Sequence, residues 1–480
     1  MAGKALRRVY VLCLYLAVQS VFANNVDRRF DVKIQALKPK GIRVYIPDEK
    51  NFSLFVFQGN VNRKIGENDV GNISGEVTSP TNGRWIFEDP NVQLKPGDVV
   101  NYYVHVVYDG KGFLEDNLSF TVQKLEDPSI PVPSTPSKCR STVTEVRNGK
   151  ACAGQVIFED TFESFREDFW LIEQYIPEQP DYPFVSYQRS PAAKVVSVDE
   201  GNLKIKPKLL QNLPGFTESS VYSDNLDLIS GCTSRSTYVA KCSMRPWGAT
   251  ILPPVVSGRI TTKSLAFKFG IVEIRAKLPQ GEWLYPDILL EPLLNKYGFL
   301  SYASGAIRIA GARGNEQLTV NNEDKSNKVL YGGPIMDFEC RQAMMNKKLS
   351  NKNWGDEFHV YSVIWAPGRI TLTVDGEEWS RVEPTATGLQ GRLTKSCQVP
   401  RELLSTGTNM APFDDFFYVT LGVAVGGISE FEDGSYSSGR PKPWRNGGRK
   451  AAMNFWQDKD SWYPTWSEGL IVDYVRVKAL

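Results

Sequence analysis

Short segments rich in β-branched and aromatic residues recur along this 480-residue chain, and apolar and polar residues alternate within them. FSLFVFQG (52–59), NYYVHVVY (101–108) and FFYVTLGVAVGG (416–427) are typical. A period of two matches the alternation of side chains on a pleated strand, whereas a helix needs a period near 3.6. Since the segment from 155 onward shows no helical period longer than a turn or two, the sequence predicts an all-β protein.

A proline-rich segment divides this β-rich sequence into two parts. Residues 126–154 carry four prolines within nine residues and show no apolar periodicity, which predicts a semi-rigid linker. Residues 24–125 alternate predicted strands with turn motifs such as KPGD (95–98), as in an immunoglobulin-like β-sandwich. Residues 155–480 continue the pattern and predict a large two-sheet sandwich.

The N-terminus predicts export from the cell. Basic residues precede an apolar run from Val9 to Ala23, and this run is shorter than the roughly 20 residues that a membrane-spanning helix needs. We therefore expect residues 1–23 to be a signal peptide and the protein to be secreted, with an uncleaved membrane anchor as the alternative. The net charge of +2, with both signs interspersed, argues against nucleic acid or an anionic membrane as a partner.

The cysteines agree with an oxidising compartment. Six remain after residue 23, and an even number predicts up to three disulfides. Local pairing is the simplest arrangement and joins Cys139 with Cys152, Cys232 with Cys242, and Cys340 with Cys397. Zinc is the alternative, but the spacings lack the rhythm of structural zinc sites, so we predict no metal and no cofactor. Sequons predict N-glycosylation at Asn51, Asn72 and Asn117.

The second part resembles the family-16 glycoside hydrolases, a β-jelly-roll group that includes the laminarinases. The resemblance runs through VIFEDTFESF, SGRITTKSLAFKFGIVEIRAKLPQG and FFYVTLGVAVGG. Active members carry a segment G-E-I-D-I-x-E-A-R-G-N that supplies, in order, the nucleophile, a helper aspartate and the acid/base glutamate. Here residues 305–315 read G-A-I-R-I-A-G-A-R-G-N. The resemblance therefore places Ala306, Arg308 and Gly311 where the three carboxylates would stand.

These substitutions predict a catalytically inactive domain. A retaining glycosidase needs two carboxyls about 5–5.5 Å apart; residues i and i+2 of a strand share a face, and a bulge brings i+5 back to it. A methyl group or a hydrogen can neither attack an anomeric carbon nor protonate a leaving oxygen. Asp287, Glu291 and Glu316 lie nearby in sequence, but none has the required strand offset. Tyr285 replaces one tryptophan with which the family stacks on sugar, and is a candidate contact.

The whole chain resembles the β-1,3-glucan recognition proteins of insects, also called Gram-negative-bacteria-binding proteins. PKGIRVYIPDEKNFSLFVFQGNVN and LKPGDVVNYYV carry this resemblance in the first part. It implies a pattern-recognition protein of the haemolymph that binds microbial polysaccharide and triggers a serine-protease cascade (Toll or prophenoloxidase). A protein that binds lipopolysaccharide or peptidoglycan instead, or that serves as an adaptor for a protease, is the alternative. An active endo-β-1,3-glucanase is the third possibility.

The family's glucan-binding motifs map onto this sequence with several changes. Only Asp116 is unchanged, and Leu114 stands where an arginine would donate hydrogen bonds to sugar hydroxyls. The face that carries these residues is alternatively a solvated sheet surface that has lost its ligand. Asp48 lies in a turn motif, so a turn role is the alternative for it. The candidate ligand-binding residues are Glu76, Tyr103, Phe113, Asp116, Asp48 and Tyr285.

Overall fold

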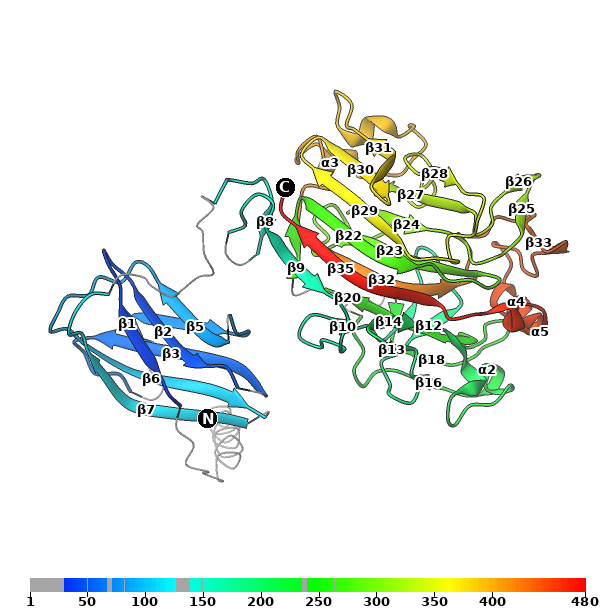
Figure 1. Cartoon of the computed structure of the whole chain (residues 1–480). Coiled ribbons are helices and arrows are strands. Elements are labelled where there is room, and N and C mark those ends of the chain that lie inside the picture. The colour runs from blue at the N-terminus through cyan, green and yellow to red at the C-terminus, as the bar shows by residue number, and fades with distance from the viewer. Residues whose placement is uncertain are drawn as a thin grey trace, which may run out of the picture. The chain divides into compact units, whose positions relative to one another are not determined.

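The computed structural model of the chain divides into two compact units, Met1–Pro136 and Ser137–Leu480 (Figure 1). It describes residues 30–49, 51–66, 71–81, 83–109, 111–126, 139–147, 150–234, 240–262 and 265–480. The predicted signal peptide and the four linker prolines lie outside these ranges. Among the described residues, no helix has the length and apolar character that crossing a membrane requires.

The first unit is a sandwich of two antiparallel sheets. The smaller sheet, in the order β1-β2-β5, consists of Lys33–Ala36, Ile42–Pro47 and Arg84–Asp89. The larger sheet, in the order β4-β3-β6-β7, consists of Ile73–Val77, Phe52–Val61, Val99–Tyr108 and Lys111–Thr121. This arrangement of seven strands is that of an immunoglobulin-like sandwich, as the sequence predicts.

The alternation within each strand builds the core of this unit. Phe55 and Phe57 of β3 and Val104 and Val106 of β6 are fully buried between the sheets, whereas the residues between them point outward and are half-buried. Because burying apolar surface is the main stabilising force, this alternation fixes which face of each strand is inward. The opposite face of the β4-β3-β6-β7 sheet is therefore available for contacts.

The second unit is a larger sandwich of the jelly-roll class. The sheet that carries the groove described below, which we call the groove sheet, follows the order β10-β20-β32-β23-β24-β27-β28. Its strands are Leu171–Ile172, Arg259–Thr261, Phe417–Val425, Leu284–Pro292, Ala306–Gly311, Val329–Ile335 and Asn346–Leu349. The packing sheet follows the order β13-β14-β35-β22-β29-β30-β31; its strands are Val196–Asp199, Asn202–Ile205, Leu470–Lys478, Gly270–Lys277, His359–Ala366, Arg369–Val374 and Glu377–Val382.

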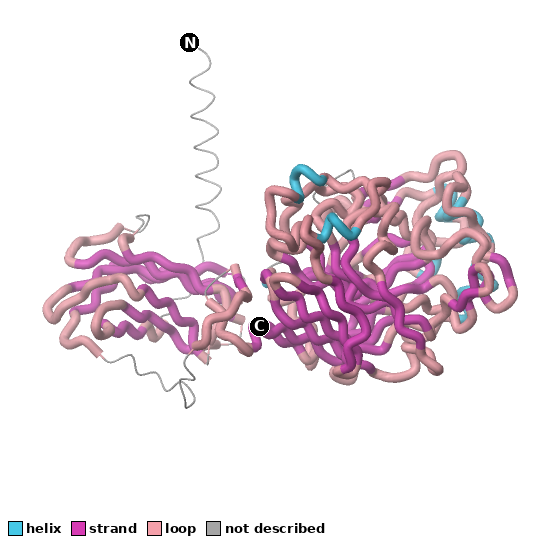
Figure 2. The backbone as a smooth tube through the Cα atoms, turned by 90° about the horizontal axis from the view of Figure 1, so that it is seen from above, coloured by secondary structure: helices cyan, strands magenta, loops and turns pink. Residues whose placement is uncertain are grey.

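One apolar core joins the two sheets of this unit. Leu421 of β32 and Ile288 of β23 are fully buried, as are Val272 of β22 and Val363 of β29 in the packing sheet. Strands dominate both units, and the helices of the described residues are short (Figure 2). The longest α-helix within the described ranges is α4, Ala451–Gln457.

The second unit makes contacts with the C-terminal part of the segment 126–154 that the sequence predicts as a linker. There β8 (Glu145–Val146) pairs with β21 (Phe267–Lys268), and Thr142 Oγ1 donates to the carbonyl of Leu480 at 2.6 Å. A two-residue strand is too short to produce a recognisable period. The three disulfides are the local pairs predicted: Cys139–Cys152, Cys232–Cys242 and Cys340–Cys397.

Candidate functional site

A groove of about 740 Å³ lies over the groove sheet of the second unit. Alternate residues of β23 line it: Tyr285, Asp287, Leu289 and Glu291. They face the groove together because residues two apart on a strand share a face. The volume falls in the range of small-molecule sites, so this groove is the main candidate site of the second unit.

Two of the three degenerate catalytic positions line this groove, and the third, Gly311, lies beside Arg308. Ala306 and Arg308 of β24 line it, and the pairing of β24 with β27 shifts between Arg308 and Gly311. This bulge is the irregularity that the spacing predicted. A Cβ added to Gly311 would lie 3.1 Å from Arg308 Cδ, so the arginine side chain occupies the space beside that glycine.

Arg308 is held by an acid from a distant part of the chain. Its Nη1 donates to Glu430 Oε2 at 3.0 Å, and Arg313 Nε lies 3.3 Å from Glu430 Oε1. Burial alone would raise the pKa of the Glu430 carboxyl, but Arg308 and Arg313 outweigh that effect and hold the pKa below its ordinary value. The site of the absent carboxylates is therefore filled by an ionised, internally paired network.

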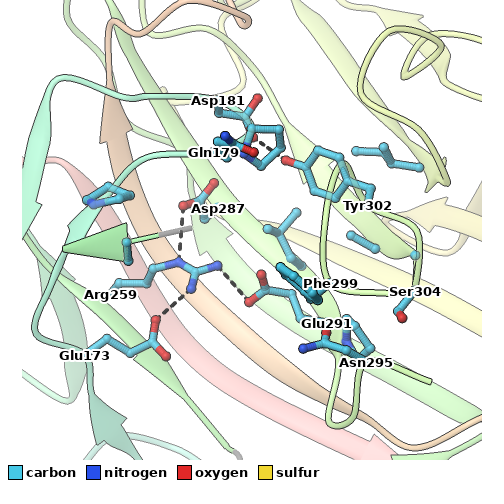
Figure 3. A pocket seen from close by; sticks show the side chains of 18 of the residues that line it. Glu173, Gln179, Asp181, Arg259, Asp287, Glu291, Asn295, Phe299, Tyr302 and Ser304 are labelled. Atoms are coloured by element: carbon cyan, nitrogen blue, oxygen red, sulfur yellow. Dashed lines mark hydrogen bonds and ion pairs between the residues drawn. The ribbon is translucent and has the colours of Figure 1, made fainter. Parts of the chain in front are cut away.

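A second arginine gathers three carboxylates at the other side of the groove (Figure 3). Arg259 of β20 donates from Nη1 to Glu173 at 2.7 Å and from Nη2 to Glu291 at 2.7 Å, and its Nε lies 3.5 Å from Asp287 Oδ2. Gly422 of β32 lies between Arg259 and Asp287 in the sheet. A Cβ there would lie 3.1 Å from Arg259 Cγ, so the missing side chain lets the arginine cross this strand.

Two of the three acids considered as replacements for the catalytic carboxylates line the groove, and the third does not. Asp287 and Glu291 both contact the guanidinium of Arg259, whereas Glu316 is exposed and lies outside the groove lining. Burial raises the pKa of Asp287, although Arg259 opposes that shift. A nucleophile must be free to attack the anomeric carbon, so one arginine shared by both acids is a poor arrangement for the two-carboxylate mechanism.

Tyr285 offers less surface than a stacking platform needs. The residue is 6% exposed, and its ring packs edge-to-face against Phe431 with centroids 5.9 Å apart. It lines the groove, so it remains a candidate contact.

The first unit brings three of its predicted ligand residues to one face. Glu76, Val56, His105 and Leu114 form a row across β4, β3, β6 and β7, on the face turned away from the core. Tyr103 lies two residues before His105 and shares this face. The pairing passes from Val104–Glu115 to Tyr102–Leu118, so Asp116 and Asn117 together oppose Tyr103 at a β-bulge. We call this surface the outer face.

Two predicted ligand residues of this unit lie elsewhere. Phe113 pairs with the buried Val106, and its ring packs against Phe30 and Tyr108 with centroids 6.2 and 6.4 Å away. Residues directly opposite each other on neighbouring strands point to the same face, and successive residues point to opposite faces. Phe113 therefore lies on the core side with Val106, whereas Leu114 lies on the outer face. Asp48 follows β2 in the other sheet and accepts a hydrogen bond from the indole nitrogen of Trp85 at 2.7 Å, which supports the turn role.

The three sequon asparagines are all exposed. Asn117 lies at the bulge that opposes Tyr103, so a glycan attached there would lie at the outer face. Glycosylation itself stays a prediction.

Sequence reasoning missed most of the groove's charged residues. Glu173 and Glu430 come from segments outside the quoted motifs, and Arg259 lies in the quoted stretch SGRITTKSLAFKFGIVEIRAKLPQG, which predicted strands and no ion pair. They meet only because β20, β32, β23 and β24 are neighbours in the sheet. The only available signal was the isolated Arg308, since a buried charge requires a partner.

The comparisons with known proteins cover both units. A family model described as "Carbohydrate binding domain (family 32)" matches residues 24–148. The chain is 57% identical to a β-1,3-glucan-binding protein of Hyphantria cunea, over 94% of this chain and 95% of that protein. It is 38% identical to β-1,3-glucan-binding protein 1 of Manduca sexta, over 99% and 100%. It is 32% identical to Gram-negative bacteria-binding protein 1 of Drosophila melanogaster, over 98% and 99%.

Among solved structures, the chain is similar to the laminarinase from Rhodothermus marinus, with a TM-score of 0.40 and 18% identity over 68% of this chain and 98% of that one. It is similar at the same level to the endo-β-1,3-glucanase from Pyrococcus furiosus, with a TM-score of 0.40 and 18% identity over 68% and 94%.

Proposed function

This chain belongs to the family of β-1,3-glucan-binding and Gram-negative-bacteria-binding proteins, and from that membership we propose that it is a secreted receptor for microbial β-1,3-glucan that does not hydrolyse its ligand. The observation that carries the proposal is the replacement of all three catalytic carboxylates by Ala306, Arg308 and Gly311 within an otherwise matching segment. Relatives named as binding proteins, of nearly the same length, support it.

Absence of hydrolysis follows from the chemistry of the groove. The acids that line it beside these positions are bound to Arg259, Arg308 or Arg341. General acid/base catalysis needs a carboxyl that can exchange its proton with the substrate. Acids that share an arginine in a buried ion pair are poorly suited to that exchange, because the guanidinium already occupies carboxylate oxygens that would have to contact the substrate.

We assign glucan binding to the outer face of the first unit. The carbohydrate-binding family model covers this unit, and Glu76, Tyr103 and Asp116 lie together there. Carboxylates accept hydrogen bonds from sugar hydroxyls, and a tyrosine ring covers the apolar face of a sugar. The replacement of the family's arginine by Leu114, which is 47% exposed, favours a shifted ligand as the second candidate, with lipopolysaccharide or peptidoglycan as the polymers to test.

Two assays test the proposal on the full-length protein. Reducing ends released from laminarin should equal those of a buffer control, and turnover that disappears in the Asp287→Asn variant would contradict the assignment. Sedimentation with curdlan, lipopolysaccharide and peptidoglycan should retain the protein on curdlan, and a Tyr103→Ala variant should be retained several-fold less.

We further propose that ligand binding activates a serine protease of an immune cascade. Adding the protein and curdlan together to plasma depleted of this protein should restore protease activity. Either component alone should not. Activation without glucan would instead favour the adaptor role.

A further inference from the structure

Two walls rise at opposite ends of the strands that floor the groove. Residues 177–184 form the first wall, at the end of β32: Phe184 N donates to Val425 O at 2.9 Å, and Ile428 N donates to Asp181 O at 3.1 Å. Residues 293–305, which connect β23 to β24, form the second wall, where Leu293 N donates to Phe416 O at 2.8 Å. Both walls contribute to the groove lining.

Asp181 joins the two walls. Its carboxylate accepts a hydrogen bond from Tyr302 Oη of the second wall and pairs with Arg341, which follows the end of β27 (Figure 3 shows the Tyr302 contact). Ser429, which follows Ile428 next to the first wall, also donates to this carboxylate. We call these contacts the Asp181 bridge. Burial would raise the pKa of Asp181, but Arg341, Ser429 and Tyr302 outweigh it and lower the pKa, so the acceptor is ionised at neutral pH.

The bridge closes one end of the groove. It stands beside the degenerate positions, since Tyr302 interacts electrostatically with Arg308. Among the described residues that line the groove, β27 contributes only Ile335 and β28 contributes none. The groove therefore stops at β24, whereas on the other side it continues over β23 and β32 to Arg259 and Glu173. A polymer that crossed the groove would meet the bridge.

The open part of the groove suits an uncharged, hydroxyl-rich ligand. Arg259 is already shared among three carboxylates and Arg308 is held by Glu430, so neither offers uncompensated positive charge to an anionic ligand. The carboxylates keep lone pairs that accept from hydroxyl groups. Phe299 and Tyr418 also line the groove and supply apolar surface for sugar rings.

We propose that the second unit holds a blind-ended pocket that receives the end of an uncharged saccharide chain, with the Asp181 bridge as its closed end. The pocket recognises a chain terminus, whereas an open groove would recognise the repeat units along a chain. The proposal does not depend on the glucan-binding site that we assign to the outer face of the first unit, because the pocket lies in the second unit.

Hydrogen exchange read by mass spectrometry tests this on the full-length protein, because it reports binding at each segment separately. The ligands are linear β-1,3-linked glucose oligomers of increasing length. We expect slower exchange in segments 177–184 and 293–305. This protection should be equal for oligomers of all lengths at equal molar concentration of chains. At equal mass, it should be several-fold weaker for longer oligomers, which then supply fewer chain ends. Protection that follows total sugar mass whatever the length, or no protection of these segments, overturns the proposal.

Removing the contacts of the Asp181 bridge should change how protection from hydrogen exchange depends on oligomer length. In Asp181→Asn, long and short chains should protect the floor strand 284–292 equally at equal mass, and Tyr302→Phe should show the same trend if the first variant folds poorly. Asp168→Asn, which alters an exposed pair with Arg166, is the matched control. A carboxymethylated oligomer should protect several-fold less than its neutral counterpart. Loss of curdlan retention in Tyr103→Ala with unchanged protection of the pocket separates this proposal from the first-unit assignment.

Discussion

Arg308 donates to Glu430 Oε2 at 3.0 Å across the floor of the groove, although 122 residues separate the two in the chain. Both side chains are nearly buried, with 11% and 6% of their surface exposed. A cation thus stands at the position where the resemblance to family-16 hydrolases places the helper carboxylate, and the acid from the loop after β32 neutralises it. A buried charge of this kind is tolerated only with its partner.

Removing the arginine alone should destabilise the second unit. We expect Arg308→Met to lower the free energy of unfolding by about 3 kcal/mol, because Glu430 stays buried with Arg313 as its remaining close partner. The double variant Arg308→Met/Glu430→Gln should recover only part of this loss, because the buried Arg313 then keeps neutral partners alone, the carbonyl of residue 430 and Tyr331 Oη. Urea denaturation followed by tryptophan fluorescence measures both. Equal losses in the single and double variants would show that the ion pair is not the cause.

Two acids of the groove should respond to pH with opposite signs. Burial raises the pKa of Asp287 in the folded protein, whereas in the unfolded chain an aspartate has a pKa of about 3.9. As pH rises above that value, the unfolded chain loses this proton more readily, so ionisation of Asp287 lowers the stability of the folded protein. Asp287→Asn should therefore gain stability relative to the wild type between acidic and neutral pH. The pKa of Glu430 is lowered, so Glu430→Gln should lose stability over the same range, and the difference should vanish once pH falls through the folded pKa. Denaturation curves across this range check both signs.

Gly311 and Arg308 should be energetically coupled. Any side chain at 311 meets Arg308 Cδ at 3.1 Å, so Gly311→Glu should cost about 2 kcal/mol, while Gly447→Glu, at a position with no neighbour within 4 Å, should cost little. Adding Arg308→Ala removes the clash, so the double variant should cost less than the sum by about 1 kcal/mol. Additive losses would contradict this contact. A side chain at the acid/base position 311 is therefore disfavoured while Arg308 remains.

Strands in which apolar and polar residues alternate clearly could be located from the sequence, whereas strands composed mainly of polar residues could not. IRVYIP and FSLFVFQG coincide with β2 and β3. Residues 111–117 contain glycine, acids and asparagine, which have low strand propensity, yet they form the first part of β7. The ladder with β6 and the bulge opposite Tyr103 supply the hydrogen bonds that local propensity does not indicate. Tertiary pairing therefore decided this segment.

The degenerate motif could be located because its flanking residues are contiguous, whereas its partners could not. Glu173 and Arg259 are 86 residues apart, and the meeting of Arg259 with Asp287 requires that Gly422 carry no side chain. No spacing within the sequence encodes such a contact. The placement of Phe113 on the core side has a similar origin, because the resemblance supplied a residue type and the register of β7 assigned its face.

The disulfides should differ in their contribution to stability. In the loop-closure model, removing the Cys340–Cys397 bridge, which spans 57 residues, costs about 4 kcal/mol, and removing Cys232–Cys242, which spans 10, costs about 3 kcal/mol. Paired serine variants and thermal unfolding test this order. Because Arg341 follows Cys340 directly, loss of the longer bridge should also speed hydrogen exchange in 177–184. Unchanged exchange there would show that the Asp181 bridge holds without the disulfide.

Tyr103 and Phe113 should separate binding from stability in the first unit. Tyr103 lies on the outer face, so Tyr103→Ala should reduce curdlan retention several-fold while changing the free energy of unfolding by less than about 1 kcal/mol. Phe113 packs against Phe30 and Tyr108 on the core side, so Phe113→Ala should cost about 2 kcal/mol while the folded fraction keeps its retention. Sedimentation below the unfolding transition, with retention normalised to folded protein, compares them directly. Lost retention in folded Phe113→Ala, with Tyr103→Ala unaffected, would place the ligand on the opposite face of the sheet.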